Sequence, residues 1–96
     1  KLDLSDSLII VSSDLSHYLP LKENSMQDKI SLDAIKDLDS ERFDKFGDAC
    51  NKNAISALLK LADYYKWQSL ILYQSNSSNV TNDTNSVVGY ASVIFY

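Results

Sequence analysis

The sequence predicts an α/β domain in which helices flank a mixed sheet, and three observations support this prediction. A short apolar run at residues 8–11 and two segments at 67–74 and 87–96, rich in branched and aromatic side chains, are typical of β-strands. Between the first two of these segments, apolar residues recur at helical spacing over 26–38 and 52–66. The predicted order is β-α-α-α-β-β, in a chain whose 96 residues suffice for one small domain.

Residues 8–11 are all apolar and have polar neighbours on both sides, which is typical of a strand buried on both faces. The polar stretch 12–18 therefore follows the C-terminal end of this strand, the edge where ligand-binding and catalytic groups collect in α/β folds. Its site candidates are two adjacent hydroxyl groups, one carboxylate and the only histidine of the chain: Ser12, Ser13, Asp14 and His17. This stretch is the first candidate site.

The first helix is expected over residues 26–38, and its predicted apolar stripe consists of Met26, Ile30, Ala34 and Leu38. Ser25 is the predicted N-cap, and Asp28 three residues later is its capping-box partner. The stretch 18–24 before this cap, which contains Pro20, is expected to be irregular.

Two further helices are predicted before the second strand. Ser40 can cap a short helix that carries two phenylalanines, and Gly47 can end it. The third helix is expected over 52–66, with Asn51 or Asn53 near its N-cap.

The second and third strands are separated by the polar loop 75–86, and loops of this length are usually functional or mobile. The last segment, 87–96, carries apolar residues on both alternating faces. Such a strand needs cover on both faces and neighbours on its flanks, as does the run at 8–11. We therefore expect partner strands that lie outside this sequence.

Composition and charge exclude several classes of function. The formal net charge is −4 and the nine Lys and Arg residues are scattered singly, so no nucleic-acid partner is expected. No apolar run approaches the roughly 18–20 residues that a membrane span needs, so no membrane partner is expected. The single cysteine cannot form an internal disulfide and suits a reducing compartment, which predicts a cytoplasmic protein.

Cys50 lies at the predicted entrance to the third helix. Helix N-termini carry partial positive charge and unpaired N–H groups, and such surroundings favour the thiolate form of a cysteine, which binds metals or attacks electrophiles. The alternative is that Cys50 is a small buried apolar residue.

His17 follows Asp14 by three residues, so a helical turn would bring the carboxylate to one ring nitrogen. That contact would fix the tautomer and leave the other nitrogen for a metal or a proton. The alternative is a capping or surface histidine. Because zinc takes three or four protein ligands and non-haem iron usually two histidines and a carboxylate, a metal site here would need ligands from outside this chain.

Four segments, in chain order, resemble the C-terminal half of the MEMO family, also called AmmeMemoRadiSam system protein B. They are 11–18 (VSSDLSHY), 48–50 (DAC) with the helix that follows, 73–76 (YQSN), and Asp83 with 87–91 (VVGYA). The resemblance implies an α/β fold similar to that of the class III extradiol ring-cleaving dioxygenases, with helices on both faces of the sheet. It also implies that residues 1–96 are the C-terminal part of one MEMO-like domain, whose N-terminal half is the partner of this chain.

The same resemblance implies a metal centre. Cys50 would be a ligand to iron or copper, together with two histidines from the N-terminal half. His17 would be a nearby base or an extra ligand, and Asp14 would orient it. The chain departs from the family pattern at Asn51, where the family usually has Gly, and at Ala54, where it often has Pro. Asn tolerates the left-handed conformation better than most residues, so we expect the turn to persist.

Three functions follow from these residues. The first is a metal-dependent oxygenase or redox enzyme for a small molecule, in which His17 moves a proton. The second is a non-catalytic metal- or peptide-binding adaptor, or an accessory protein of a radical-SAM-linked system, and Asn51 beside Cys50 motivates it. The third is a purely structural role, with the chemistry upstream.

Overall fold

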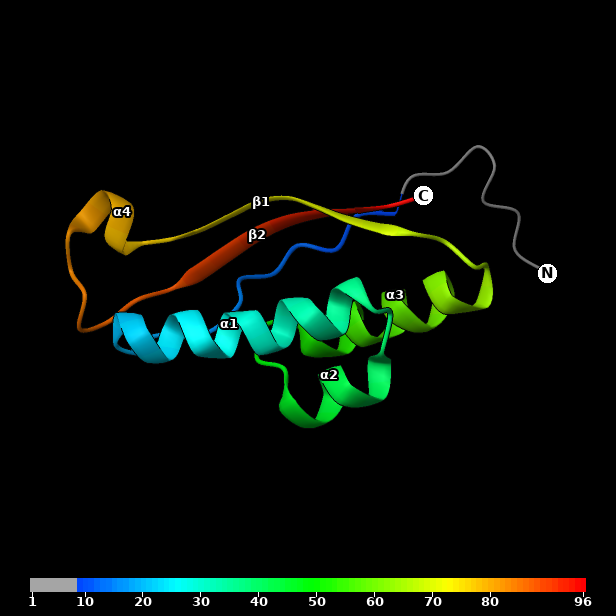
Figure 1. Ribbon diagram of the computed structural model, residues 1–96, viewed down its shortest axis with the longest axis horizontal. Coiled ribbons are helices and arrows are strands. Elements are labelled where there is room, and N and C mark those ends of the chain that lie inside the picture. The colour runs from blue at the N-terminus through cyan, green and yellow to red at the C-terminus, as the bar shows by residue number, and fades with distance from the viewer. Residues whose placement is uncertain (1–8) are drawn as a thin grey trace.

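The computed structural model describes residues 9–96 as a helical layer against a two-stranded antiparallel sheet (Figure 1). The elements in chain order are α1 (Leu21–Lys36), α2 (Ser40–Phe46), α3 (Lys52–Tyr64), β1 (Ser69–Asn76), α4 (Ser78–Thr81) and β2 (Gly89–Phe95). Helices α1 to α3 lie on one side of the sheet, and α4 lies between the two strands at the far end of the hairpin. The predicted α/β class is confirmed, whereas the helices of the described residues cover one face of the sheet rather than both.

The strand predicted at 8–11 is wrong for the residues that the structure describes. Residue 8 lies outside them, residues 9–11 adopt no strand, and Ile10 is 78% exposed. A doubly buried strand needs neighbours and cover, and residues 9–96 supply neither here. The chain instead pairs later, where Leu19 forms an isolated antiparallel bridge with Val87.

The first helix, α1, begins at Leu21, five residues before its predicted start. The prediction that 18–24 is irregular is therefore wrong for residues 21–24, which are helical. Pro20 is the N-cap residue, and the N–H of Leu21 donates to the carbonyl oxygen of Thr84 at 2.9 Å. That bond satisfies one of the N–H groups that a helix start leaves unpaired. Ser25 is therefore an exposed residue within α1 instead of its cap.

The buried face of α1 also differs from the predicted stripe. Met26 and Ile30 are exposed, and the residues that face the protein interior are Asn24, Asp28, Ser31, Leu32, Ala34 and Ile35. Several of these residues are polar, so a search for apolar spacing could not identify this face. Asp28, predicted as a capping residue, lies in the protein interior.

The remaining helices agree closely with the sequence. The cap of α2 is Asp39, one residue before the predicted Ser40, and its carboxylate accepts the N–H of Arg42 at 3.0 Å. Gly47 follows the end of α2, as predicted. Asn51 is the N-cap of α3, which confirms one of the two predicted positions.

The hairpin of β1 and β2 confirms the last two predicted strands. Ser69 pairs with Phe95 at one end and Asn76 with Gly89 at the other, with a register shift between Ile71 and Tyr73. Alternate residues of β2 pack against the core: Ala91, Val93 and Phe95. The loop predicted at 75–86 contains the one-turn helix α4, which sequence inspection missed.

The core lies between the helices and the sheet and consists of Leu15, Leu32, Ala34, Ile35, Phe43 and Leu59. Leu15 belongs to the segment before α1, so burial of its side chain fixes the backbone beside Asp14. An apolar cavity of about 540 Å³ extends from this core toward Trp67 and Tyr96. The segment before α1 is thus anchored to the core through Leu15.

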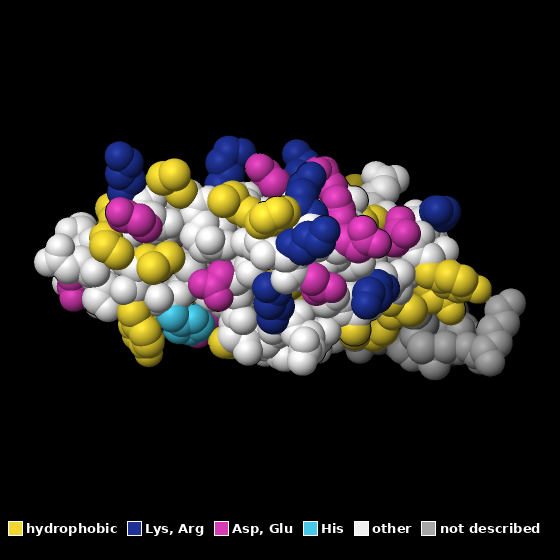
Figure 2. Space-filling model, turned by 90° about the horizontal axis from the view of Figure 1, so that it is seen from below, with side chains coloured by type: hydrophobic (Ala, Val, Ile, Leu, Met, Phe, Trp, Pro, Cys, Tyr) yellow, Lys and Arg dark blue, Asp and Glu magenta, His cyan; other side chains and the backbone are white. Residues whose placement is uncertain are grey.

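The face of the molecule seen in Figure 2 carries side chains of both charges close to one another. Surface ion pairs join Lys29 to Asp33 and Arg42 to Asp37, each at 2.9 Å. Such exposed pairs contribute little to stability, because solvent screens the two charges. Across residues 9–96, no helix is both long and apolar enough to cross a membrane.

Candidate metal centre

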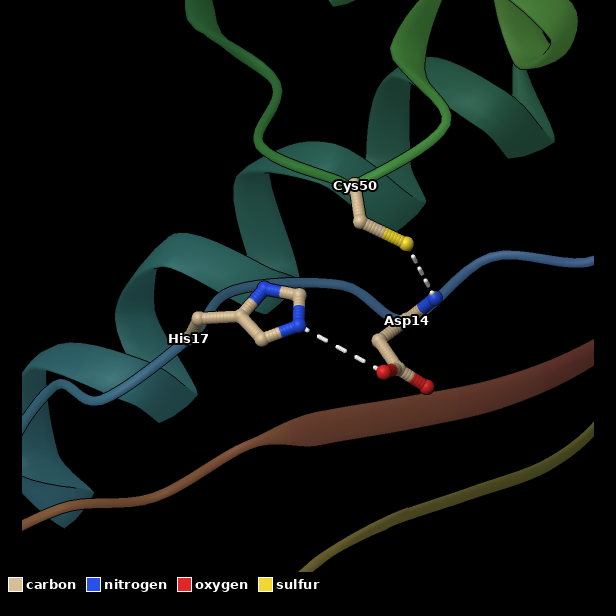
Figure 3. Close-up of side chains that lie close together, drawn as sticks. All are labelled: Asp14, His17 and Cys50. Atoms are coloured by element: carbon tan, nitrogen blue, oxygen red, sulfur yellow. Dashed lines mark hydrogen bonds and ion pairs between the residues drawn. The ribbon is translucent and has the colours of Figure 1, made fainter.

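Asp14, His17 and Cys50 lie together in the structure (Figure 3). Each offers one ligand atom, and these atoms all lie within 4.8 Å of one another. Asp14 and His17 belong to the segment before α1, and Cys50 belongs to the turn that leads into α3. The fold thus brings together all three residues that the sequence predicted for the site.

Reciprocal hydrogen bonds attach the turn of Cys50 to Asp14. The N–H of Cys50 donates to the carbonyl oxygen of Asp14 at 3.1 Å, and the N–H of Asp14 donates to Cys50 Sγ at 3.2 Å. The sulfur is therefore held on the segment that carries the carboxylate and the imidazole. Cys50 is exposed, so its interpretation as a buried apolar residue is wrong.

Ser13 connects the same two segments. Its Oγ donates to the carbonyl oxygen of Asp14 at 2.8 Å, accepts the N–H of Asn51 at 2.9 Å and lies 3.4 Å from Cys50 Sγ. Asn51 Nδ2 also donates to the carbonyl oxygen of Ser12, at 3.3 Å. The Ser13 hydroxyl group and the Ser12 carbonyl oxygen thus close the turn around Cys50.

Asn51 does not adopt the left-handed conformation that a glycine would favour, since its φ angle is −114°. The turn therefore needs no glycine at this position. The side chain of Asn51 instead adds the bond to Ser12, which glycine could not make. Asn51, where the family usually has Gly, therefore still allows the turn around Cys50 to close.

The predicted contact between Asp14 and His17 is confirmed. His17 Nε2 lies 3.4 Å from Asp14 Oδ2, with the two side chains 30% and 47% exposed. The intervening residues form a bend instead of a helical turn, and Tyr18 has a positive φ of 61°. The Tyr18 ring meets the imidazole edge-on, with centroids 5.5 Å apart, so His17 is held from two sides.

The three donors fit a transition-metal ion. Thiolate and imidazole bind zinc, iron and copper, and a carboxylate completes sets of this kind. Ligands at about 2.0–2.3 Å from one ion stand no more than about 4.5 Å apart, which is close to the 4.8 Å within which these three donors lie. Asp14, predicted only to orient His17, is thus a third candidate ligand.

The protein therefore has a mixed α/β fold. A cysteine, a histidine and a carboxylate lie together beside its helices. A family model described as Memo-like protein matches residues 2–94. The chain therefore belongs to the Memo family, as the resemblance predicted.

Relatives from archaea and bacteria match over nearly the whole chain. A MEMO1 family protein of Thermoplasma acidophilum is 35% identical over 92 residues, which is 91% of this chain and 34% of that protein. One from Methanococcus maripaludis is 35% identical over 95 residues, covering 91% and 33%. One from Aquifex aeolicus is 30% identical over 98 residues, covering 94% and 36%. The chain thus spans about a third of the length of these relatives.

Proposed function

We propose that this chain contributes a metal centre for iron or copper to a Memo protein with an oxygenase or redox role on a small molecule. The observation that supports this proposal is the convergence of Asp14, His17 and Cys50 within 4.8 Å. A soft thiolate beside an imidazole suits iron and copper, and such an ion, when bound, supplies Lewis-acid and one-electron chemistry.

Each residue of the centre has a distinct proposed role. Cys50 is the anchoring ligand, because two hydrogen bonds with Asp14 fix its position. His17 is a further ligand or a base, since its partly exposed ring can exchange a proton with a substrate. Asp14 orients the imidazole through the contact with Nε2, and its carboxylate can also bind the ion.

The remaining ligands are proposed to come from the N-terminal half of the same protein. The support is the sheet face that the described helices leave open. It exposes large apolar side chains: Leu70, Leu72, Tyr73, Tyr90 and Ile94. A continuous apolar face of this kind is typical of a packing interface. We also propose a cytoplasmic location, because a reducing compartment keeps an exposed, unpaired thiol such as Cys50 reduced.

Metal analysis of the full-length natural protein, purified without oxygen or chelator, tests the proposal. We expect near-stoichiometric iron or copper in the wild type and a severalfold loss in Cys50→Ser. The matched control is Asp63→Asn, an exposed change on α3 away from the site. Wild-type protein without metal, or a Cys50→Ser variant with its full metal content, would refute a Cys50-anchored centre.

Oxygen uptake distinguishes the oxygenase from the adaptor or accessory protein. Both share the centre, so metal content alone does not separate them. Turnover that depends on His17 and Cys50 supports the enzyme. Full metal occupancy without oxygen uptake across a screen of small-molecule reductants and aromatic substrates supports the adaptor.

A further inference from the structure

A cluster of buried polar side chains lies directly behind the candidate metal centre. Ser16, Asn24 and Asp28 are all at most 2% exposed. Asp28 Oδ1 accepts the backbone N–H of Ser16 at 3.0 Å, and Asn24 Nδ2 donates to Ser16 Oγ at 2.7 Å. Ser16 immediately precedes His17, and both residues of α1 hold it, Asp28 through the backbone N–H and Asn24 through the hydroxyl group.

The opposite side of the Asp28 carboxylate is in contact with Gly89, the first residue of β2. A Cβ atom added to Gly89 would lie 1.6 Å from Asp28 Oδ2, so only glycine leaves room for the carboxylate. Gly89 also bonds the same segment, through its N–H to Ser16 and its carbonyl oxygen to the N–H of Leu15, each at 2.9 Å. Asp28 is therefore enclosed between Ser16 and the start of β2.

Burial of a carboxylate group has an unfavourable free energy of desolvation, so it stabilises a fold poorly. Burial raises the pKa of Asp28, and the hydrogen bonds from the Ser16 hydroxyl and N–H only partly oppose this effect. Apolar residues of similar volume often stabilise a core equally well or better. What a carboxylate provides, and an apolar residue does not, is a directed acceptor for the Ser16 N–H.

We propose that Asp28 is a positioning residue of the metal centre. By accepting the Ser16 N–H, it fixes the backbone at Ser16, one residue before His17, and so sets where the imidazole lies relative to Asp14 and Cys50. The role is indirect, since Asp28 acts through Ser16. It rests on the proposed function for its effect on metal binding, whereas its effect on the position of His17 can be measured without metal.

Cobalt(II) binding to the full-length natural protein tests the effect on the centre. The thiolate-to-cobalt absorption reports Cys50, and the ligand-field bands report the other donors. We expect Asp28→Ala to retain the thiolate band but to weaken cobalt affinity by about 10–100-fold, as losses of residues behind metal ligands typically do. Asp28→Asn, which keeps an acceptor oxygen, should stay close to the wild type, as should the control Asp63→Asn.

Two double variants show whether the effect passes through the proposed contacts. Gly89→Ala should displace the carboxylate and weaken affinity as Asp28→Ala does, and the combination should be no worse than Asp28→Ala alone. After His17→Ala, Asp28→Ala should have no further effect. Additive losses in either pair, or unchanged cobalt affinity in a folded Asp28→Ala variant, would overturn the proposal.

Amide exchange and ring contacts in the metal-free protein separate this proposal from the proposed function. The Ser16 amide should exchange slowly in the wild type and in Asp28→Asn, and faster in Gly89→Ala, together with weaker nuclear Overhauser contacts between the His17 and Tyr18 rings. A wild type that shows this pattern but binds no cobalt contradicts the metal centre and leaves the positioning of His17 by Asp28 supported. Rapid Ser16 exchange in the wild type, or no change in Gly89→Ala, contradicts the positioning role itself.

Discussion

Among single residues, Ser13 connects the turn around Cys50 to the Asp14 segment through its side chain. One hydroxyl group accepts the Asn51 N–H and donates to the Asp14 carbonyl oxygen, while lying against the sulfur. The position of the thiol therefore depends on an uncharged side chain as much as on the candidate ligands.

Ser13→Ala should lower the free energy of unfolding by about 1 kcal/mol, the usual net value of a hydrogen bond that is removed. It should also weaken metal binding, because the Cys50 turn loses its link to the Asp14 segment. Chemical denaturation and metal titration measure the two effects. Ser25→Ala is the matched control, since Ser25 is exposed on α1. Equal behaviour of the two variants would show that Ser13 does not hold the turn.

Asp28 gives a pH dependence with a definite sign. Burial raises its pKa from the ordinary value of 3.8, so the folded state binds the proton more tightly than the unfolded state. The resulting stabilisation is fully present below the unfolded pKa and is lost as the pH rises through the folded pKa. The wild type should therefore gain stability relative to Asp28→Asn as the pH falls from 7 toward 4. Denaturation of both proteins across this range measures the difference, and a constant difference would contradict the burial effect.

The residues of the centre could be predicted from the sequence because each stands at a recognisable place: Asp14 and His17 after an apolar run, and Cys50 before a helix. Asp28 could not be assigned its place by the same means. Its helix buries Asn24 and Ser31 along with apolar residues, so the apolar spacing pointed to Met26 and Ile30, which are exposed. The partner that makes a buried carboxylate tolerable, the Ser16 N–H, is a backbone group that sequence patterns do not show.

Among the helices and strands, the short helix α2 has its N-cap one residue before the position that the sequence predicts. The sequence offers Asp39 and Ser40 as adjacent capping residues, and the structure uses Asp39, which accepts the Arg42 N–H. The choice depends on the backbone conformation that leads out of α1. Spacing alone cannot distinguish two neighbouring residues that both favour caps.

Alanine substitution distinguishes these two residues. Asp39→Ala should lower the free energy of unfolding by about 1 kcal/mol, because the Arg42 N–H loses its acceptor. Ser40→Ala should change it by a few tenths of a kcal/mol at most, since Ser40 is already within the helix and alanine is a good helix former. Equal losses in denaturation experiments would show that the helix start shifts between the two residues.

At the scale of the whole molecule, the helices and the final hairpin could be predicted because their patterns arise from local spacing. The first strand could not, because a doubly buried strand depends on neighbours that the described residues do not contain. The same dependence explains the open face of the sheet. Leu70 and Ile94 are paired across the two strands and remain 47% and 42% exposed, although their apolar character is that of buried residues.

Substitutions on the open face of the sheet should have different effects on residues 1–96 alone and on the full-length natural protein. Replacing Leu70 and Ile94 together by threonine keeps β-propensity and removes apolar surface. Residues 1–96 on their own should then self-associate less, because an exposed apolar sheet face promotes association. The full-length natural protein should instead lose about 2 kcal/mol or more of stability, because the substitutions remove apolar contacts where the N-terminal half is proposed to pack.

Sedimentation of the short chain and thermal unfolding of the full-length protein measure these two effects. Val80→Thr, on α4 and away from the sheet, is the control that should change neither. A full-length double variant with unchanged stability would mean that this face stays open to solvent. That result would contradict the proposed packing of the N-terminal half on this face.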